Sequence, residues 1–354
     1  MIDTIEILKQ ARKRKGITLK ELSEKSGVSL GTVNKLFSGA IASVKVSTAK
    51  KLANALEISL DGDTDNTLKI ENVENNYGFV KCAALTNEIR VADVEFNTKT
   101  TVELINKAAK KNVSVAVFPE LNLTSYTLGD LVAQENLIFA SLEALKTVAK
   151  ATVGLNMLVF VGMPVRVFSR LYNCAVAICN GEILAVIPKK NLPNYNEFSE
   201  RRSFCEADDE VTTIDLFGKS VPFGYKIILQ NNLYPELKIA CEICEDLWVP
   251  NAPSIYHSLE GATLIVNLST SNEIAGKEHY RRQMISTHSS KCICGYVYAS
   301  SGYGESTSQT VFGGHNVICD AGRIVAESQP FDSAIAIGDI DCGFLEFERS
   351  KKFK

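Results

Sequence analysis

The spacing of hydrophobic residues changes once along the chain, after a short polar stretch. In residues 3–56 apolar side chains recur at helical spacing, and from residue 77 they form short runs that predict strands with helices between them. Residues between these two patterns are acidic and polar with no apolar period. The sequence therefore predicts a helical domain at 1–60, a linker at 61–76, an α/β domain at 77–345 and a tail at 346–354.

The expected elements of the α/β domain follow from runs of Val, Ile, Leu and Ala. Predicted strands cover 79–84, 113–118, 157–164, 172–179, 182–188, 237–244, 262–268, 293–299, 309–319 and 322–327, and predicted helices cover 97–111 and 134–152. Asn180–Gly181 and Ala321–Gly322 are expected to form two hairpin turns. Strands with interleaved helices predict sheets covered by helices in a layered domain.

Four helices are expected in the first domain, at 3–15, 19–25, 29–37 and 48–56. Thr18 has Glu21 three residues later, the spacing of a capping box. The segment LKELSEKSGVSLGTVNKLFSG resembles the helix-turn-helix of the phage-repressor-like family. This resemblance implies that four residues face the DNA major groove, namely Ser29, Thr32, Asn34 and Lys35. Bundles of this kind also serve as dimerisation or docking modules, so a protein partner is the alternative.

Charge separates the two domains further. The net charge is −3, but residues 1–60 carry +6 and residues 61–354 carry −9. A basic first domain fits an anionic partner such as DNA. No apolar run approaches the roughly 18 residues of a membrane span and no signal peptide begins the chain, so a cytoplasmic protein without membrane contact is expected.

The ten cysteines are scattered through apolar segments of a chain with no secretory signal, which favours reduced, buried thiols. Cys241 and Cys244 form a lone CxxC pair, and Cys292 and Cys294 a lone CxC pair. Neither has a second pair at zinc-finger spacing and the chain has four histidines, so no metal site is expected.

Three of the predicted strands end in a reactive residue: Glu120 follows Phe118–Pro119, Lys189 follows Ile187–Pro188, and Cys244 follows Ile243. A thiol attacks as thiolate, so it needs a carboxylate to accept its proton and a cation to stabilise charge. Lys189 and the backbone N–H of Glu245 would stabilise the oxyanion formed on an amide. Singly, Glu120 could cap a helix, Lys189 could be solvated and Cys244 could be core; their combination predicts amide hydrolysis through a thioester.

Five segments, in order, carry a resemblance to a known family: FPELNLTSY, PKKNLPNYNEFSERRSF, CEICEDLWVP, NLSTSNEIAGKEHYRR and YVYASSGYGEST. They resemble the nitrilase-superfamily glutaminase domain of glutamine-dependent NAD synthetases, over about residues 77–345. The resemblance implies a four-layer α-β-β-α sandwich that assembles into homo-oligomers. It implies Glu120 as general base, Lys189 as the catalytic amine and Cys244 as nucleophile, with no cofactor. It also implies a glutamine pocket made of Tyr126, Tyr195, Glu200, Glu245, Ser271 and Lys277.

The sequence differs from the whole family protein in having the added basic helical domain and in lacking the Ser-Gly-Gly-x-Asp-Ser loop of an ammonia-consuming synthetase domain. The leading hypothesis is a glutamine amidohydrolase that supplies ammonia to an NAD synthetase domain or subunit, with the tail as the start of the connector to such a domain. The rival is a DNA-binding regulator with an amidase-shaped sensor domain. A third hypothesis is an amidase that acts on another small amide.

Overall fold

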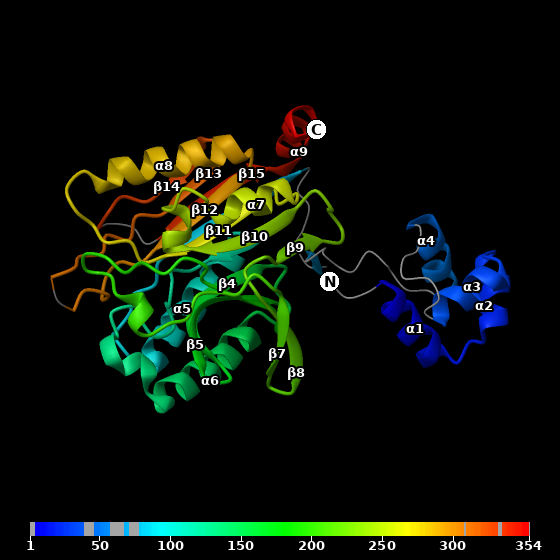
Figure 1. Ribbon diagram of the computed structural model, residues 1–354. Coiled ribbons are helices and arrows are strands. Elements are labelled where there is room, and N and C mark those ends of the chain that lie inside the picture. Colours follow the sequence, from blue (N-terminus) through cyan, green and yellow to red (C-terminus); the bar gives the residue numbers. More distant parts are fainter. Residues whose placement is uncertain are drawn as a thin grey trace. The chain divides into compact units, whose positions relative to one another are not determined.

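The structure, a computed structural model, describes residues 4–38, 46–56, 67–70, 78–307, 309–331 and 335–353. The chain divides into two compact units, Met1–Asn66 and Thr67–Lys354, shown by their blue and their cyan-to-red colours in Figure 1. Among the described residues, no helix is long and apolar enough to cross a membrane.

The first unit is a helical bundle made of α1 (Thr4–Lys15), α2 (Leu19–Ser26), α3 (Leu30–Phe37) and α4 (Val46–Ala55). The expected capping box is present, because Thr18 Oγ1 accepts the N–H of Glu21 and Glu21 Oε2 accepts the N–H of Thr18. Gly27 ends α2 at φ +65°, a conformation that favours glycine. Apolar side chains from all four helices fill the core: Leu8, Leu22, Val28, Val33, Leu36, Leu52 and Leu56.

The larger unit contains two sheets. The eight-stranded sheet runs in the order β15 (Ile335–Asp341), β2 (Phe79–Leu85), β3 (Val115–Val117), β4 (Leu158–Val167), β5 (Arg170–Cys179), β6 (Glu182–Pro188), β8 (Lys219–Phe223), β7 (Thr212–Leu216). The seven-stranded sheet runs in the order β1 (Thr67–Ile70), β9 (Ile228–Asn231), β10 (Lys238–Ile243), β11 (Leu264–Ser269), β12 (Gly295–Ser300), β13 (Val317–Asp320), β14 (Arg323–Glu327).

Helices cover the outer face of each sheet. In Figure 1, α5 (Val94–Ala109) and α6 (Glu135–Ala151) lie on the eight-stranded sheet, and α7 (Pro253–Leu259) and α8 (Lys277–Cys292) lie on the seven-stranded sheet. One apolar cluster lies between the sheets and one lies under each helix pair. The expected four-layer α-β-β-α sandwich is therefore confirmed. Both predicted hairpin turns have positive φ at each central residue, as that turn type requires.

The unit boundaries differ from those expected. Four residues of the expected linker form β1, which pairs with β9 in parallel, so the larger unit begins at Thr67 instead of 77. The rest of the 61–76 segment lies outside the described residues. The expected tail at 346–354 belongs to α9 (Cys342–Lys352), whose Arg349 donates to the carbonyls of Cys292 and Ile293.

Candidate active site

The two sheets each deliver part of the site at strand ends. Glu120 follows β3 and Lys189 follows β6 in the eight-stranded sheet, and Cys244 follows β10 in the seven-stranded sheet. Glu120 and Lys189 are fully buried, and Cys244 is 6% exposed. The structure thus brings together the three residues that the apolar runs indicated.

Lys189 lies between two carboxylates. Its Nζ is 2.7 Å from Glu120 Oε1 and 2.6 Å from Glu200 Oε1. Burial alone would lower the pKa of Lys189, but the charges of Glu120 and Glu200 outweigh it and raise the pKa well above its usual value. The amine is therefore held as an ammonium ion at neutral pH.

Residues of both sheets hold the Glu120 carboxylate. Asn173 Nδ2, from β5, donates to Glu120 Oε1 at 2.7 Å, and the backbone N–H of Thr270, just after β11, donates to Oε2 at 3.0 Å. Thr270 Oγ1 also donates to the Glu120 carbonyl at 3.1 Å. The orientation of this carboxylate is therefore fixed by hydrogen bonds from opposite sides.

Cys244 occupies a left-handed backbone conformation, φ +44°, where β10 turns into the 3₁₀ helix η3 (Cys244–Leu247). Its backbone N–H donates to Asn267 Oδ1 at 3.2 Å. Burial and then the negative charge of Glu120 raise the pKa of the Cys244 thiol to about 12, although Lys189 opposes this. The resting residue is a thiol, so attack requires a base that takes its proton during the reaction.

Glu200, expected in the substrate pocket, lies against Lys189. It belongs to the short helix η2 (Glu200–Arg202), and its Oε1 accepts both Lys189 Nζ and, at 2.8 Å, the hydroxyl of Tyr126. Burial raises the pKa of Glu200 to about 7, while Lys189 acts in the opposite direction. Tyr126 and Glu200 also line a cavity of about 330 Å³, so they connect Lys189 to an open space.

Two of the other expected pocket residues, Tyr195 and Glu245, lie around a separate opening. Tyr195 OH donates to Glu245 Oε2 at 2.8 Å, and both line a second cavity of about 400 Å³. Lys277 lies at the start of α8 with its ammonium group 5.1 Å from the centre of the Trp248 ring. Ser271 is buried. The structure therefore does not place all six expected residues in the lining of one cavity.

Several polar residues of the site were missed by sequence reasoning. They share buried or bridging positions between distant segments: Asn173, Glu197, Asp246, Asn272 and Glu305. Asn272 Nδ2 donates to Glu197 Oε1, and Asn272 Oδ1 accepts Lys277 Nζ. Glu305 Oε1 accepts the backbone N–H groups of Tyr126 and Thr127 at 2.9 and 2.8 Å. The acidic run after Cys244 was the one signal that could have identified Asp246.

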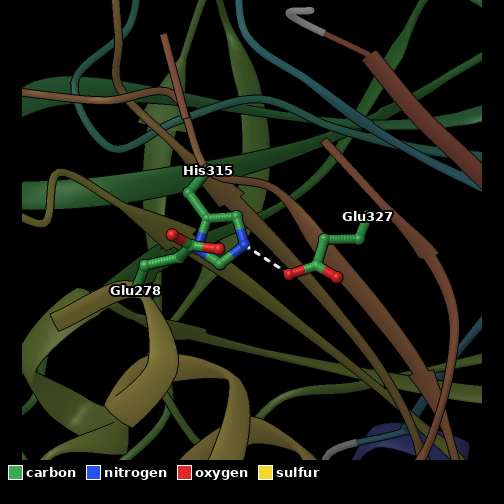
Figure 2. A group of neighbouring side chains, drawn as sticks. All are labelled: Glu278, His315 and Glu327. Atoms are coloured by element: carbon green, nitrogen blue, oxygen red, sulfur yellow. Dashed lines mark hydrogen bonds and ion pairs between the residues drawn. The ribbon is translucent and has the colours of Figure 1, made fainter. Parts of the chain in front are cut away.

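Glu278, His315 and Glu327 form the one group in the described ranges that has metal-ligand chemistry and close spacing, and Figure 2 shows it. The His315 nitrogens already have partners, because Nδ1 accepts an N–H of Arg281 at 2.8 Å and Nε2 donates to Glu327 Oε1 at 2.7 Å. A guanidinium against Nδ1 opposes a bound cation there. The ring is a hydrogen-bonded core histidine, and the group carries no metal assignment.

In the first unit, Ser29 caps α3, since its Oγ accepts the N–H of Thr32 at 3.3 Å and lies 2.8 Å from Thr32 Oγ1. Asn34 and Lys35 are exposed on α3, while Val33 and Leu36 face the core. Of the four expected DNA-facing residues, Ser29 and Thr32 thus pair through their hydroxyls, and Ser29, Asn34 and Lys35 are exposed.

Comparison with known proteins gives two sequence families. The family model described as Carbon-nitrogen hydrolase matches residues 81–347, and the one described as Helix-turn-helix matches residues 8–62. The glutamine-dependent NAD(+) synthetase of Mycobacterium tuberculosis (strain ATCC 25618 / H37Rv) is 36% identical over 275 residues, which cover 77% of this chain and 40% of that protein. The synthetase of Aquifex aeolicus (strain VF5) is 28% identical over 73% of this chain and 42% of that protein.

Solved structures agree on the fold. A glutamine-dependent NAD(+) synthetase from Cytophaga hutchinsonii has a TM-score of 0.66 at 24% identity, covering 74% of this chain and 42% of that chain. A mutant amidase from Nesterenkonia sp. AN1 in complex with butyramide has a TM-score of 0.59 at 15% identity, covering 77% of this chain and 95% of that chain. The chain spans about 40% of the length of the curated synthetases it matches.

Proposed function

The chain belongs to the carbon-nitrogen hydrolase family, and from this premise we propose that it is a glutamine amidohydrolase that works through a cysteine thioester. The proposal rests on the position of Lys189, which is buried between Glu120 and Glu200. Lys189 lies at a strand end of the eight-stranded sheet, and Cys244 lies at a strand end of the other sheet. A buried cation paired with two carboxylates beside a thiol is a set of groups for acyl transfer without histidine.

The reaction begins when Glu120 takes the thiol proton as Cys244 Sγ attacks the side-chain amide carbon. A tetrahedral oxyanion forms, and its donors are the Lys189 ammonium and the backbone N–H of Glu245. That N–H lies in the first turn of η3, where helical N–H groups have no partner within the helix. Glu120 then gives the proton to the leaving nitrogen, the C–N bond breaks, and ammonia departs from the thioester.

Water completes the reaction. Glu120 accepts a proton from water, the oxygen attacks the thioester carbonyl, and the C–S bond breaks to release glutamate and restore the thiol. The raised pKa of Cys244, to about 12, makes the thiolate a strong base, so it regains its proton at the end of the cycle. Each step uses one proton carrier, the buried Glu120.

Glutamine as the amide is supported by charged side chains beyond the triad. Glutamine carries an α-ammonium and an α-carboxylate that simpler amides lack. Lys277 is a cation near Cys244, and acids near it include Glu197, across Asn272, and Glu245. An acid and a cation joined by a neutral amide suit the recognition of a zwitterion. The relatives' printed names, glutamine-dependent NAD(+) synthetases, favour the same substrate.

The ammonia would feed NAD synthesis on an ammonia-accepting synthetase domain or subunit, as those names suggest. The test of the first step is Cys244→Ala, which should abolish glutamate and ammonia release from glutamine while the protein stays folded. Full turnover in this variant would overturn the assignment. Homo-oligomer assembly, a cytoplasmic location and the lack of any cofactor stay predictions.

DNA binding by the first unit is the second proposed function. It is supported by the helix-turn-helix match at residues 8–62, by the net charge of +6 on residues 1–60, and by the exposed Asn34 and Lys35 on α3. A chain with both activities would be an enzyme that also acts as a regulator. The alternative partner for the same helix is a protein surface.

A further inference from the structure

Asp246 lies two residues after the nucleophile, and its carboxylate is buried at 2% exposure. Its two oxygens receive N–H groups from two separate segments. Oδ2 accepts the backbone N–H of Ile243 at 3.0 Å, and Oδ1 accepts the backbone N–H of Asn191 at 2.7 Å. Asn191 Nδ2 adds a bond to Oδ1 at 2.8 Å, and the N–H of Lys190 lies 3.4 Å from Oδ2.

These contacts join the two sheets at the site. Ile243 is the last residue of β10, directly before Cys244, and belongs to the seven-stranded sheet. Lys190 and Asn191 directly follow Lys189, which continues from β6 of the eight-stranded sheet. The Asp246 side chain therefore connects the turn that carries the thiol to the segment that carries the amine. Asp246 and Asn191, its partner in that segment, are 55 residues apart in sequence.

We propose that Asp246 is a positioning residue that sets the distance between Cys244 and Lys189. The proposal rests on the proposed amide hydrolysis, since it concerns the geometry of that reaction. Burial raises the pKa of Asp246 to about 7, but both oxygens face only N–H donors, which favour the ionised form. Hydrogen bonds to an ionised acceptor are roughly twice as strong as neutral ones, so this carboxylate makes a stiff connection. A misplacement of about 1 Å at a catalytic group can cost on the order of 10²-fold in rate.

The arrangement requires both oxygens. In Asp246→Asn the amide nitrogen cannot accept an N–H, so either the Ile243 bond or the Asn191 bonds are replaced by two facing donors. The substitution keeps the size of the side chain but breaks the connection. An effect on the reaction that is separate from substrate binding is the expected signature, because Asp246 has no place in the lining of either cavity.

The test compares Asp246→Asn with the control Asp209→Asn in the full chain. Asp209 accepts the side chain of Lys190 at 2.9 Å from an exposed position, so Asp209→Asn removes a carboxylate that contacts the same segment through a side chain and not through the backbone. We expect Asp246→Asn to lower kcat for glutamine by about 10²-fold with KM changed by less than about threefold. The control should keep kcat within about twofold.

A kcat within twofold of wild type in folded Asp246→Asn would overturn the proposal, as would a rise in KM at constant kcat. If Asp246→Asn does not fold, Asn191→Ala removes one bond to Oδ1 and should still lower kcat more than KM changes. The alkylation rate of Cys244 by iodoacetamide, read by peptide mass spectrometry, tests the geometry without glutamine. It should fall in Asp246→Asn and stay at the wild-type value in the control, even if the wild-type protein does not hydrolyse glutamine.

Discussion

Gly162, in β4, lies directly against the backbone of Glu120. A Cβ atom at Gly162 would be 2.9 Å from the carbonyl carbon of Glu120 and 2.2 Å from the backbone nitrogen of Leu121, closer than side chains approach backbone. The N–H of Gly162 also donates to Asn122 Oδ1 at 2.8 Å. The backbone of Glu120, the general base of the proposed reaction, therefore packs directly against Gly162, where no side chain fits.

The first prediction follows from this contact. Gly162→Ala must push the 119–121 backbone away, so we expect kcat for glutamine to fall by about 10²-fold and the free energy of unfolding to drop by roughly 1–3 kcal/mol. Ammonia release and urea unfolding measure the two effects. Gly31→Ala is the control, because a Cβ at Gly31 meets nothing within 4 Å. Unchanged kcat in Gly162→Ala would mean that the backbone relaxes without moving Glu120.

Tyr126 and Glu200 should differ in how strongly they affect the rate. Glu200→Gln leaves the buried Lys189 with one charged partner, which we expect to lower kcat by about 10²-fold or more. Tyr126→Phe removes a single hydrogen bond to Glu200 and should lower kcat by about 3–10-fold. Steady-state ammonia release compares the two. A larger loss in Tyr126→Phe than in Glu200→Gln would contradict this order.

Substrate choice should depend on Glu197 and Lys277. Each charged hydrogen bond to the α-substituents of glutamine contributes about 1.5–3 kcal/mol, so Glu197→Gln and Lys277→Met should lower kcat/KM for glutamine by about 10–100-fold. Butyramide has no α-substituents and serves as the internal control. Its hydrolysis should be the same in the variants and the wild type. Equal losses for both amides would assign these side chains to structure instead of recognition.

Glu305 should make the larger unit less stable as the pH rises. Burial raises the pKa of Glu305 from 4.5 to about 7, so between these values the folded state holds a proton that the unfolded state has released. The contribution of protonated Glu305 to the free energy of unfolding is fully present below pH 4.5 and is lost as the pH rises through 7. Unfolding in urea at pH 5–8, followed by the fluorescence of Trp248, the chain's single tryptophan, measures it.

Glu305→Gln should flatten that dependence on pH, since glutamine does not ionise. The exposed Glu143 provides the matched control, because Glu143→Gln should leave the slope as in wild type. A slope unchanged by Glu305→Gln would show that other groups carry the pH dependence.

DNA binding by the full chain should depend on Asn34 and Lys35. We expect the double variant Asn34→Ala, Lys35→Ala to weaken binding to DNA fragments, and wild-type binding to weaken as salt rises. Gel-shift titrations at two salt concentrations test this. Lys219→Ala, at an exposed lysine of the larger unit, is the control. No binding to any DNA at low salt would leave the protein-docking alternative for α3.

The fold and the strand-end positions of Glu120, Lys189 and Cys244 could be predicted from the sequence because both depend on local patterns. Apolar runs mark β3, β6 and β10, and the residue that follows each run lies at a sheet edge. Strand β1 was missed, since four residues within an acidic, polar stretch give too short a pattern, and pairing with β9 decides the outcome.

Side-chain partners could not be predicted in the same way. Glu200 was assigned to the substrate pocket, but its contact with Lys189 depends on how the loop after β6 folds back. Asn173 lies within a strand that reads as apolar, and its contact with Glu120 joins residues 53 apart. The acidic run after Cys244 marks Asp246, but it does not reveal its partners near Asn191, which come from the other sheet.

The contacts of Glu120 also set an order of events during protein synthesis. Its carboxylate is held by Thr270, 150 residues later, and Thr270 Oγ1 lies 2.9 Å from Ser301 Oγ. Long-range contacts of this kind form only after the distant segment is available. A growing chain thus cannot hold this base in place until both segments have left the ribosome, whereas the described core of the helix-turn-helix unit lies within residues 8–56 and is complete far earlier. The proposed binding of DNA or of a docking partner could therefore occur on the nascent chain before the proposed amide hydrolysis.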